Sequence, residues 1–241
     1  MASESLVTKT ASELKKIIMS PGPDGYKLPN ENELAAKLHI NRGTLRQALA
    51  ILEYEGYIVR KQKVGTFLNP YITDIGVRLE DITGIFQQIK NFGFTPRVEY
   101  KDFSYAPASK PISKKLGIGD GSVLLCSQAK FYADNSPAAF VRDWVPVHLI
   151  QKPMDIQNPG NSIFDFLDNY CNSKVKHEIS EIIPIQCDQD LSEILNLPLS
   201  KLLIQLNSVV FDQKNDPVMY SELIFNDQYF KLSVVRRFIS T

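Results

Sequence analysis

Two arginines four residues apart, Arg42 and Arg46, lie in a short polar segment that could read DNA bases. Residues at this spacing share one face of a helix. Arginine can bind a guanine edge through two hydrogen bonds, and asparagine or glutamine can do the same to adenine. The same face would carry Asn41, Gly43 and Gln47. The spacing therefore indicates a helix that enters a major groove, although two arginines on a helix are often only a solvated surface.

Other groups near this segment suit the DNA backbone. Gly43 and Thr44 would let the N-terminus of the helix approach a phosphate, whose charge the helix dipole favours. A hairpin is expected over residues 57–68, with Lys61 and Lys63 at its basic tip. These lysines would face phosphates or the adjacent minor groove.

Three predicted helices would position these side chains. Apolar spacing favours a first helix over residues 6–19. Asn30, with Glu33 three residues later, is a capping box for a second helix, and Asn41 caps a third. A short turn joins the last two helices, so the third can cross the second and reach a groove. Three helices followed by a basic hairpin predict a winged helix-turn-helix DNA-binding domain over residues 1–69.

The rest of the chain mixes strands and short helices. The predicted strands are 98–105, 123–132, 138–145, 175–186, 202–212, 217–225 and 231–238. Short turns between strands favour an antiparallel α+β domain over a parallel sheet. We expect residues 70–77 to form a linker and residues 78–241 to form this second domain.

Composition excludes several classes of function. The 241 residues carry 27 basic and 27 acidic side chains, divided as +3 over residues 1–70 and −3 over residues 71–241, so the basic end suits a polyanion. The first ten residues lack a signal-peptide core and no apolar run reaches about 20 residues, so we expect a cytoplasmic protein without a membrane span. The three cysteines and three histidines have no metal-ligand spacing, and no nucleophile or phosphate-loop motif occurs. We expect no catalytic residue, no metal and no cofactor.

The N-terminal motifs resemble the GntR family of bacterial transcriptional regulators. The matching segments are 28–35, 40–49, 52–58 and 65–67. This resemblance implies that Arg42, Thr44 and Arg46 contact operator DNA, with Gly65 in the wing. Asn32 stands where the family often has a DNA-contacting arginine, and Lys63 stands where the wing tip often has glycine. Asn41 replaces a usual serine or threonine, so the operator read by this chain could differ.

The C-terminal part resembles the UTRA ligand-sensing domain of the HutC subfamily. The segments that carry the resemblance are 93–96, 107–109, 116–117, 134–137, 145–146, 162–167 and 216–220. Such domains adopt a chorismate-lyase-like α+β fold, usually dimerise and bind a small effector that changes operator affinity. The resemblance therefore implies a homodimer with double-stranded operator DNA and a small molecule as partners.

Four positions depart from relatives that sense sugar phosphates. Ala129 and Phe131 replace two arginines, Met219 replaces a glutamate and Phe225 replaces an arginine. Without arginine an oxyanion loses its strongest hydrogen bonds. We therefore expect an effector that is neutral or apolar rather than a sugar phosphate.

Other residues lie in segments that border the effector in relatives. These candidates are Thr95, Arg97, Arg142, Ser162, Phe164, Tyr220 and Glu222. Three of them have a simpler explanation. Arg142 can form a surface pair with Asp143. Ser162 can serve only as a helix cap, and Phe164 can belong to the core.

The sequence as a whole predicts a ligand-responsive regulator, with repression as the usual mode among similar proteins. Two alternatives remain open: a lyase-like enzyme with a DNA-binding domain, and a constitutive DNA-binding protein with a vestigial pocket.

Overall fold

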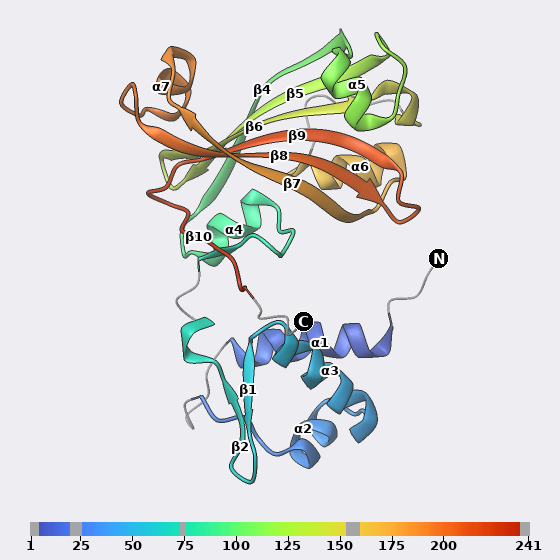
Figure 1. Cartoon of the computed structure of the whole chain (residues 1–241), viewed down its shortest axis with the longest axis vertical. Helices are drawn as coiled ribbons and strands as arrows, with labels where there is room; N and C mark the ends of the chain where they lie inside the picture. The colour runs from blue at the N-terminus through green and yellow to red at the C-terminus, as the bar shows by residue number, and fades with distance from the viewer. Residues whose placement is uncertain (1–4, 20–25, 73–75, 153–159, 237–241) are drawn as a thin grey trace, which may run out of the picture. The chain divides into compact units, whose positions relative to one another are not determined.

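The chain folds into two compact units (Figure 1). The computed structural model describes residues 5–19, 26–72, 76–152 and 160–236. The first unit contains the residues up to Glu80 together with those from Leu232 onward, and the second contains Asp81–Lys231. The chain therefore passes between the units twice.

Three helices and a two-stranded antiparallel hairpin form the body of the first unit. Their bounds are Leu6–Ile18 (α1), Glu31–Lys37 (α2), Arg42–Tyr54 (α3), Ile58–Lys61 (β1) and Gly65–Leu68 (β2). These elements share one apolar core, in which the side chains of Leu14, Leu45 and Leu52 are fully buried. The predicted winged helix-turn-helix is confirmed.

The caps read from the sequence are present at α2 and α3. Asn30 Oδ1 accepts a hydrogen bond from the Glu33 backbone N–H at 3.0 Å, and a Glu33 carboxylate oxygen accepts one from the Asn30 N–H at 3.3 Å. Asn41 Oδ1 accepts from the Thr44 N–H at 2.8 Å. Between the helices His39 adopts a left-handed φ of 53°. These local bonds fix where α3 begins, and thus which of its residues face outward.

The first unit also holds both segments by which the chain enters and leaves the second unit. After a short 3₁₀ turn (Pro70–Ile72), strand β3 (Val77–Arg78) pairs in parallel with strand β10 (Leu232–Ser233). Val235 then packs against the core of the winged helix. The sequence predicted a longer strand over 231–238 inside the second domain; β10 covers two residues, and residues 237–238 lie outside the described ones. Val235 finds its apolar contacts in the first unit, beside Gly56, where an added Cβ would lie 3.4 Å from Val235 Cγ1.

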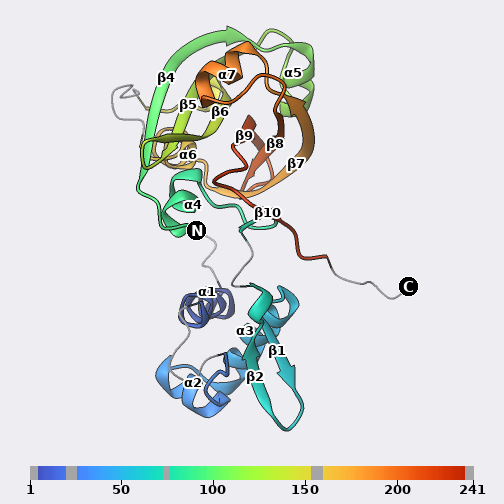
Figure 2. The ribbon, with the colours of Figure 1, turned by 90° about the vertical axis from the view of Figure 1, so that its left-hand side faces the viewer.

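A six-stranded sheet forms the second unit, with every neighbouring pair antiparallel. The strands are Pro96–Pro107 (β4), Val123–Ala133 (β5), Ser136–Pro146 (β6), Val175–Gln186 (β7), Leu202–Asp212 (β8) and Pro217–Phe225 (β9). Their order is β4-β5-β6-β9-β8-β7, and the sheet curls so that the two edge strands lie on opposite sides of the unit (Figure 2). The predicted antiparallel α+β class is confirmed.

Short helices cover the two faces of this sheet. They are Ile85–Asn91 (α4), Lys110–Leu116 (α5), Ile163–Cys171 (α6) and Gln189–Leu195 (α7), with a 3₁₀ turn at Val147–Leu149. Helix α6 packs on Leu125 and Val145, and we call this side the α6 face. Helix α5 packs on Leu124 and α7 packs on Phe140, on the α5/α7 face. Successive residues of a strand point to opposite faces, so one residue of offset decides which face a side chain joins.

We predict that Asn30→Ala lowers the free energy of unfolding by about 1 kcal/mol, because it removes one half of the capping box. Asn32→Ala is the matched control: the same substitution in the first turn of the same helix, where the side chain is exposed and makes no cap. Urea unfolding followed by circular dichroism measures both variants. Equal stability of the two would show that the box contributes nothing.

Candidate DNA-binding surface and effector site

Helix α3 exposes the arginines that the sequence singled out. The side chains of Arg42 and Arg46 are 60% and 62% exposed, while Leu45 and Leu49 on the other side of the helix are buried. Gln47 is exposed beside them. The predicted face is therefore free to meet another molecule.

A carboxylate on α2 gathers both arginines. Arg46 Nε lies 2.8 Å from Glu31 Oε2, and Arg42 Nη2 lies 3.9 Å from the same oxygen. Asn32, next along α2, is exposed. Sequence reasoning missed Glu31, whose only signal was an acidic residue at the start of the helix before the arginines. Its contacts hold the two guanidinium groups close together on one surface.

The start of α3 leaves Asn41 with only part of its hydrogen-bonding capacity. Its side-chain oxygen is occupied by the Thr44 N–H. Because a bidentate adenine contact uses both the oxygen and the amide N–H, Asn41 could make that contact only by giving up its cap. Gly43 lies under this cap, and an added Cβ there would come within 3.1 Å of Asn41 Oδ1. The small residue at position 43 is thus fitted to the cap as well as to a close approach of phosphate.

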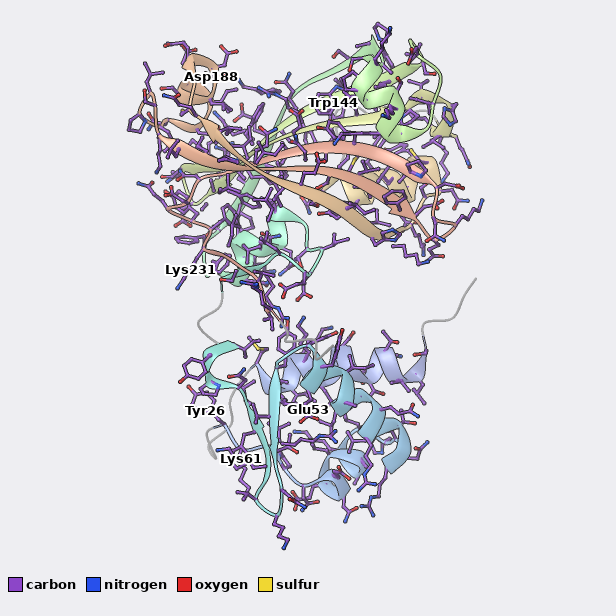
Figure 3. The ribbon with its side chains drawn as sticks, viewed as in Figure 1. Tyr26, Glu53, Lys61, Trp144, Asp188 and Lys231 are labelled. Atoms are coloured by element: carbon purple, nitrogen blue, oxygen red, sulfur yellow. The ribbon has the colours of Figure 1, made fainter. Side chains whose placement is uncertain are left out.

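The hairpin brings a lysine that the sequence reading did not include. The ammonium groups of Lys61 and Lys27 lie 5.3 Å and 5.9 Å from the centre of the Phe67 ring (Figure 3 labels Lys61). Lys63 has a left-handed φ of 62°, which explains why glycine suits this position. Gly65 has a φ of 133°, and an added Cβ would lie 3.3 Å from Lys27 Cε. The hairpin and Lys27, which lies between α1 and α2, therefore form one basic edge, which we call the hairpin edge.

The candidate effector residues fall on two opposite faces of the sheet. Those on the α6 face are Ala129, Phe131, Met219 and Phe225. Those on the α5/α7 face are Arg142, Tyr220 and Glu222. One pocket floor cannot contain both sets.

Arg142 does not pair with its neighbour Asp143, which is buried on the opposite face. Its partner is Glu222, at 3.6 Å between Nη1 and Oε2. The alternative explanation of Arg142 as part of an Arg142–Asp143 surface pair is therefore wrong. The physical reason is the alternation of side chains along β6.

Thr95 and Arg97 lie at the edge strand β4. The Thr95 backbone N–H donates to Asp134 Oδ1 at 2.9 Å. The Arg97 guanidinium lies 3.6 Å from the centre of the Tyr132 ring and 3.3 Å from Glu99, and its side chain is half exposed. The structure gives these two residues local partners rather than placing them beside the α6 face.

Ser162 and Phe164 begin helix α6. Ser162 Oγ accepts from the Asp165 N–H at 3.2 Å, so the hydroxyl serves as a helix cap. Phe164 lines a hollow of about 450 Å³. The other residues that line it are Ile82, Asp165, Asp168, Lys174, Val175 and Lys176.

The α6 face also carries a transverse row of polar residues that the sequence reading missed. Directly opposite one another on five successive strands lie Ser127, Asp143, Ser221, Ser208 and Ser180. We call this set the serine–aspartate row. The face is therefore not the apolar surface that Ala129, Phe131, Met219 and Phe225 predicted. Each strand shows only one small polar residue at an inward position, so no single segment signalled the row.

Asp143 is the charged member of the row and is 2% exposed. Ser221 Oγ donates to its carboxylate at 2.7 Å. The pKa of Asp143 is raised to about 7, chiefly by burial; the hydroxyls of Ser221 and Ser127 oppose the shift, and the Glu178 carboxylate adds to it. The pKa of Glu178 is itself raised by burial.

Within the described residues, no helix has the length and apolar character needed to cross a membrane. The same residues contain no cluster of three or more His, Cys, Asp or Glu side chains that could hold a metal ion.

Comparison with known proteins agrees with this architecture. The family described as "Bacterial regulatory proteins, gntR family" matches residues 7–68, and the UTRA domain family matches residues 92–231. One curated relative is the transcriptional regulator YurK of Bacillus subtilis, which is 27% identical over 87% of this chain and 84% of its own length. Another is GgaR of Escherichia coli, which is 24% identical over 90% of this chain and 85% of its own length. A probable fructoselysine utilization operon repressor of Shigella flexneri is 22% identical over 87% of this chain and 85% of its own length.

Solved structures show the same fold. YydK of Bacillus subtilis superposes with a TM-score of 0.75, covering 97% of this chain and all of that chain at 16% identity. PhnF of Mycobacterium smegmatis gives 0.61, covering 95% and 99% of the two chains, also at 16% identity. The matching families and curated relatives are transcriptional regulators rather than enzymes. The gntR family matches the winged helix, and the UTRA family matches more than half of the sequence. The chain therefore belongs to the GntR family of bacterial transcriptional regulators, in the group that carries a UTRA domain.

Proposed function

We propose that this regulator is a dimeric repressor that binds a near-palindromic operator and releases it when a small effector occupies the second unit. The observation that carries the proposal is the exposed face of α3, where Glu31 gathers Arg42 and Arg46. Base contacts from these arginines would set sequence specificity. Phosphate contacts from Thr44 and from the lysines of the hairpin edge would set affinity.

A dimer follows from the geometry that such an operator requires. One winged helix offers one recognition helix, whereas a near-palindrome presents two half-sites about 34 Å apart. Two copies related by a two-fold axis would match both half-sites. Repression is supported by the name of the Shigella flexneri relative. The protein would act in the cytoplasm, where bacterial DNA lies.

The effector would bind on the α6 face and would lack a phosphate group. On the four central strands, the described residues of this face include no lysine or arginine. Among them are Ala129 and Phe131, which stand where relatives that sense sugar phosphates carry arginines. An oxyanion here would find no bidentate partner.

Coupling between effector and operator would use the paired segments β3 and β10. These strands continue directly into the two connections to the second unit. Arg78 on β3 donates to the backbone oxygen of Glu55, the C-cap of α3, at 2.9 Å. A displacement of β3 would therefore reach α3. For this to change operator affinity, the effector must bind the two dimer states with different affinities.

We predict that Arg46→Ala weakens operator binding by roughly 1–3 kcal/mol, because a base contact is lost without loss of core packing. Fluorescence anisotropy on DNA from upstream of the gene measures the affinity, at one fixed salt concentration. Arg97→Ala is the matched control, an exposed arginine in the second unit. Unchanged affinity of Arg46→Ala, in a protein with normal circular dichroism, would contradict the assigned role.

A further inference from the structure

The carboxyl group of Asp143 lies in the middle of the sheet and has no cation to balance it. The ion pairs among the described residues include neither Asp143 nor Glu178. The titratable groups that act on this region from other elements are Tyr100 on β4, Asp165 on α6 and Glu178 on β7. All of these are acids. A buried carboxylate without a counterion is costly, so the site favours an incoming positive charge.

A second polar group beside Asp143 also has unused hydrogen-bonding capacity. The Ser127 side chain is 3% exposed, and its hydroxyl has no hydrogen bond of good geometry within the described part of the chain. It lies near enough to Asp143 to lower the pKa of that carboxyl. Buried hydroxyls normally have partners, so an unsatisfied one points to a ligand that completes it.

The remaining hydroxyls extend the row toward β7. Ser208 and Ser180 are 2.7 Å apart, and Ser180 donates to Glu178 at 3.0 Å. Ser208 is buried. Hydroxyls can donate and accept, so this part of the row suits the hydroxyl groups of a ligand.

A hollow lies at the start of α6, and its lining residues are different from those of the serine–aspartate row. Phe164 and Asp165 are among the residues that line it. Burial raises the pKa of Tyr100, and the negative charges of Asp143 and Asp165 raise it further, so this tyrosine on β4 senses both carboxylates.

We propose that the serine–aspartate row binds a hydroxylated amine, with the ammonium group at Asp143 and the ligand hydroxyls along Ser127 and Ser208. This inference rests on the proposed function, since the amine would be the effector. The ammonium group would supply the missing counterion, whereas a phosphate at the row would face the carboxyl groups of Asp143 and Glu178. The two lysines that line the hollow at α6 do not belong to the row. Purely apolar ligands would leave Ser127 unsatisfied.

The test uses the full chain and matched pairs of small molecules. The amines are glucosamine, galactosamine and 1-amino-1-deoxysorbitol; the neutral partners are glucose, galactose and sorbitol; glucose 6-phosphate is the anionic probe. Thermal unfolding at pH 7, where all three amines are mostly protonated, reports binding, because a ligand that binds only the folded state raises Tm. We expect at least one amine to raise Tm by several degrees while its neutral partner and the phosphate do not.

Asp143→Asn identifies the residue responsible. The amide has the shape of the protonated acid, so the variant should fold and should lose at least tenfold in amine affinity. Asp190→Asn, on an exposed residue of α7, is the matched control and should bind like the original chain. Ser127→Ala is a second variant in case Asp143→Asn does not fold; it removes a hydroxyl whose only interaction among the described residues is its weak contact with Asp143, and it should weaken amine binding several-fold.

Three results would overturn the inference: no amine in the panel stabilises the chain, a neutral partner stabilises it equally, or the amine stabilises Asp143→Asn as well as the original. Operator anisotropy on the same samples separates this from the proposed function. A chain that binds amine through Asp143 but never binds DNA would refute the repressor and keep the site. A chain that binds DNA and is released only by compounds other than amines would keep the repressor and refute the amine site.

The protonation state of Asp143 gives an independent prediction. Its pKa of about 7 in the folded chain lies above the ordinary value of 3.8, so the folded state binds more protons than the unfolded state between these values. The stability contributed by this group is therefore lost as pH rises from about 4 to 7. Asp143→Asn should show a flatter decline of Tm between pH 5 and 8. The pKa of Glu178 is also raised by burial, so its titration accounts for the decline that remains. An identical slope in both proteins would show that Asp143 does not titrate in this range.

Amine binding should accordingly release protons below pH 7. For 1-amino-1-deoxysorbitol, whose alkyl ammonium stays protonated over this range, affinity should increase about tenfold from pH 6 to pH 8, as the ionised fraction of Asp143 increases. Calorimetry at pH 6 in two buffers of different ionisation enthalpy measures the protons released, and Asp143→Asn should release none. Proton release that persists in the variant would assign it to another group.

Discussion

Both connections between the two units pass through one small parallel strand pair, and the way the molecule can work depends on it. Val77 pairs with Leu232, and Arg78 pairs with Ser233. The Val235 N–H donates to Glu80, which also lies 3.6 Å from Arg78. The chain leaves the first unit after Glu80 and returns at Leu232, so both connections begin within two residues of this pair.

Arg78 makes the pair sensitive to such movement. Its guanidinium is 8% exposed, lies 4.4 Å from the centre of the Tyr57 ring and donates from Nη2 to Glu55. Its Nε and Nη1 have no hydrogen-bond partner among the described residues. A buried cation with unsatisfied donors gains from any rearrangement that supplies acceptors. A modest shift of β3 would therefore let Arg78 give up its hydrogen bond to Glu55, at the end of α3, for a different acceptor.

The winged helix was predictable from sequence because its determinants are local. The capping box at Asn30 and Glu33 and the cap at Asn41 act across three residues, and they set the face that α3 presents. What could not be predicted there depends on contacts across the chain. Glu31 meets Arg46 fifteen residues away, and Lys27 reaches Phe67 only because the hairpin folds back.

The second unit was predictable as a class but not as a site. Alternating segments and short turns indicated antiparallel strands, and six of the seven predicted strands formed in the sheet. Among the described residues, the predicted strand 231–238 is reduced to β10, which pairs in parallel with β3. The site depends on register between strands far apart in sequence: Ser221 bonds Asp143 across 78 residues. The family resemblance supplied positions along the chain, yet it placed Arg142 and Ala129 in one candidate set although they lie on opposite faces. Register, rather than residue type, decides which polar groups share a face.

The unbalanced carboxyl of Asp143 links this register to the proposed regulation. Burial raises the pKa of this group to about 7, so near neutral pH a large fraction of it is protonated. A bound ammonium would let it ionise, and the free energy gained depends on how closely Ser127, Asp143 and Ser221 stay aligned on three neighbouring strands. If one dimer state aligns these strands better than the other, the ligand favours that state. If operator DNA favours the other state, the ligand lowers the affinity for DNA, and DNA lowers the affinity for the ligand by the same factor. On the proposed function, binding at the serine–aspartate row would act on the DNA-binding unit through a shift in strand alignment, passed along the two chain connections that continue from β3 and β10.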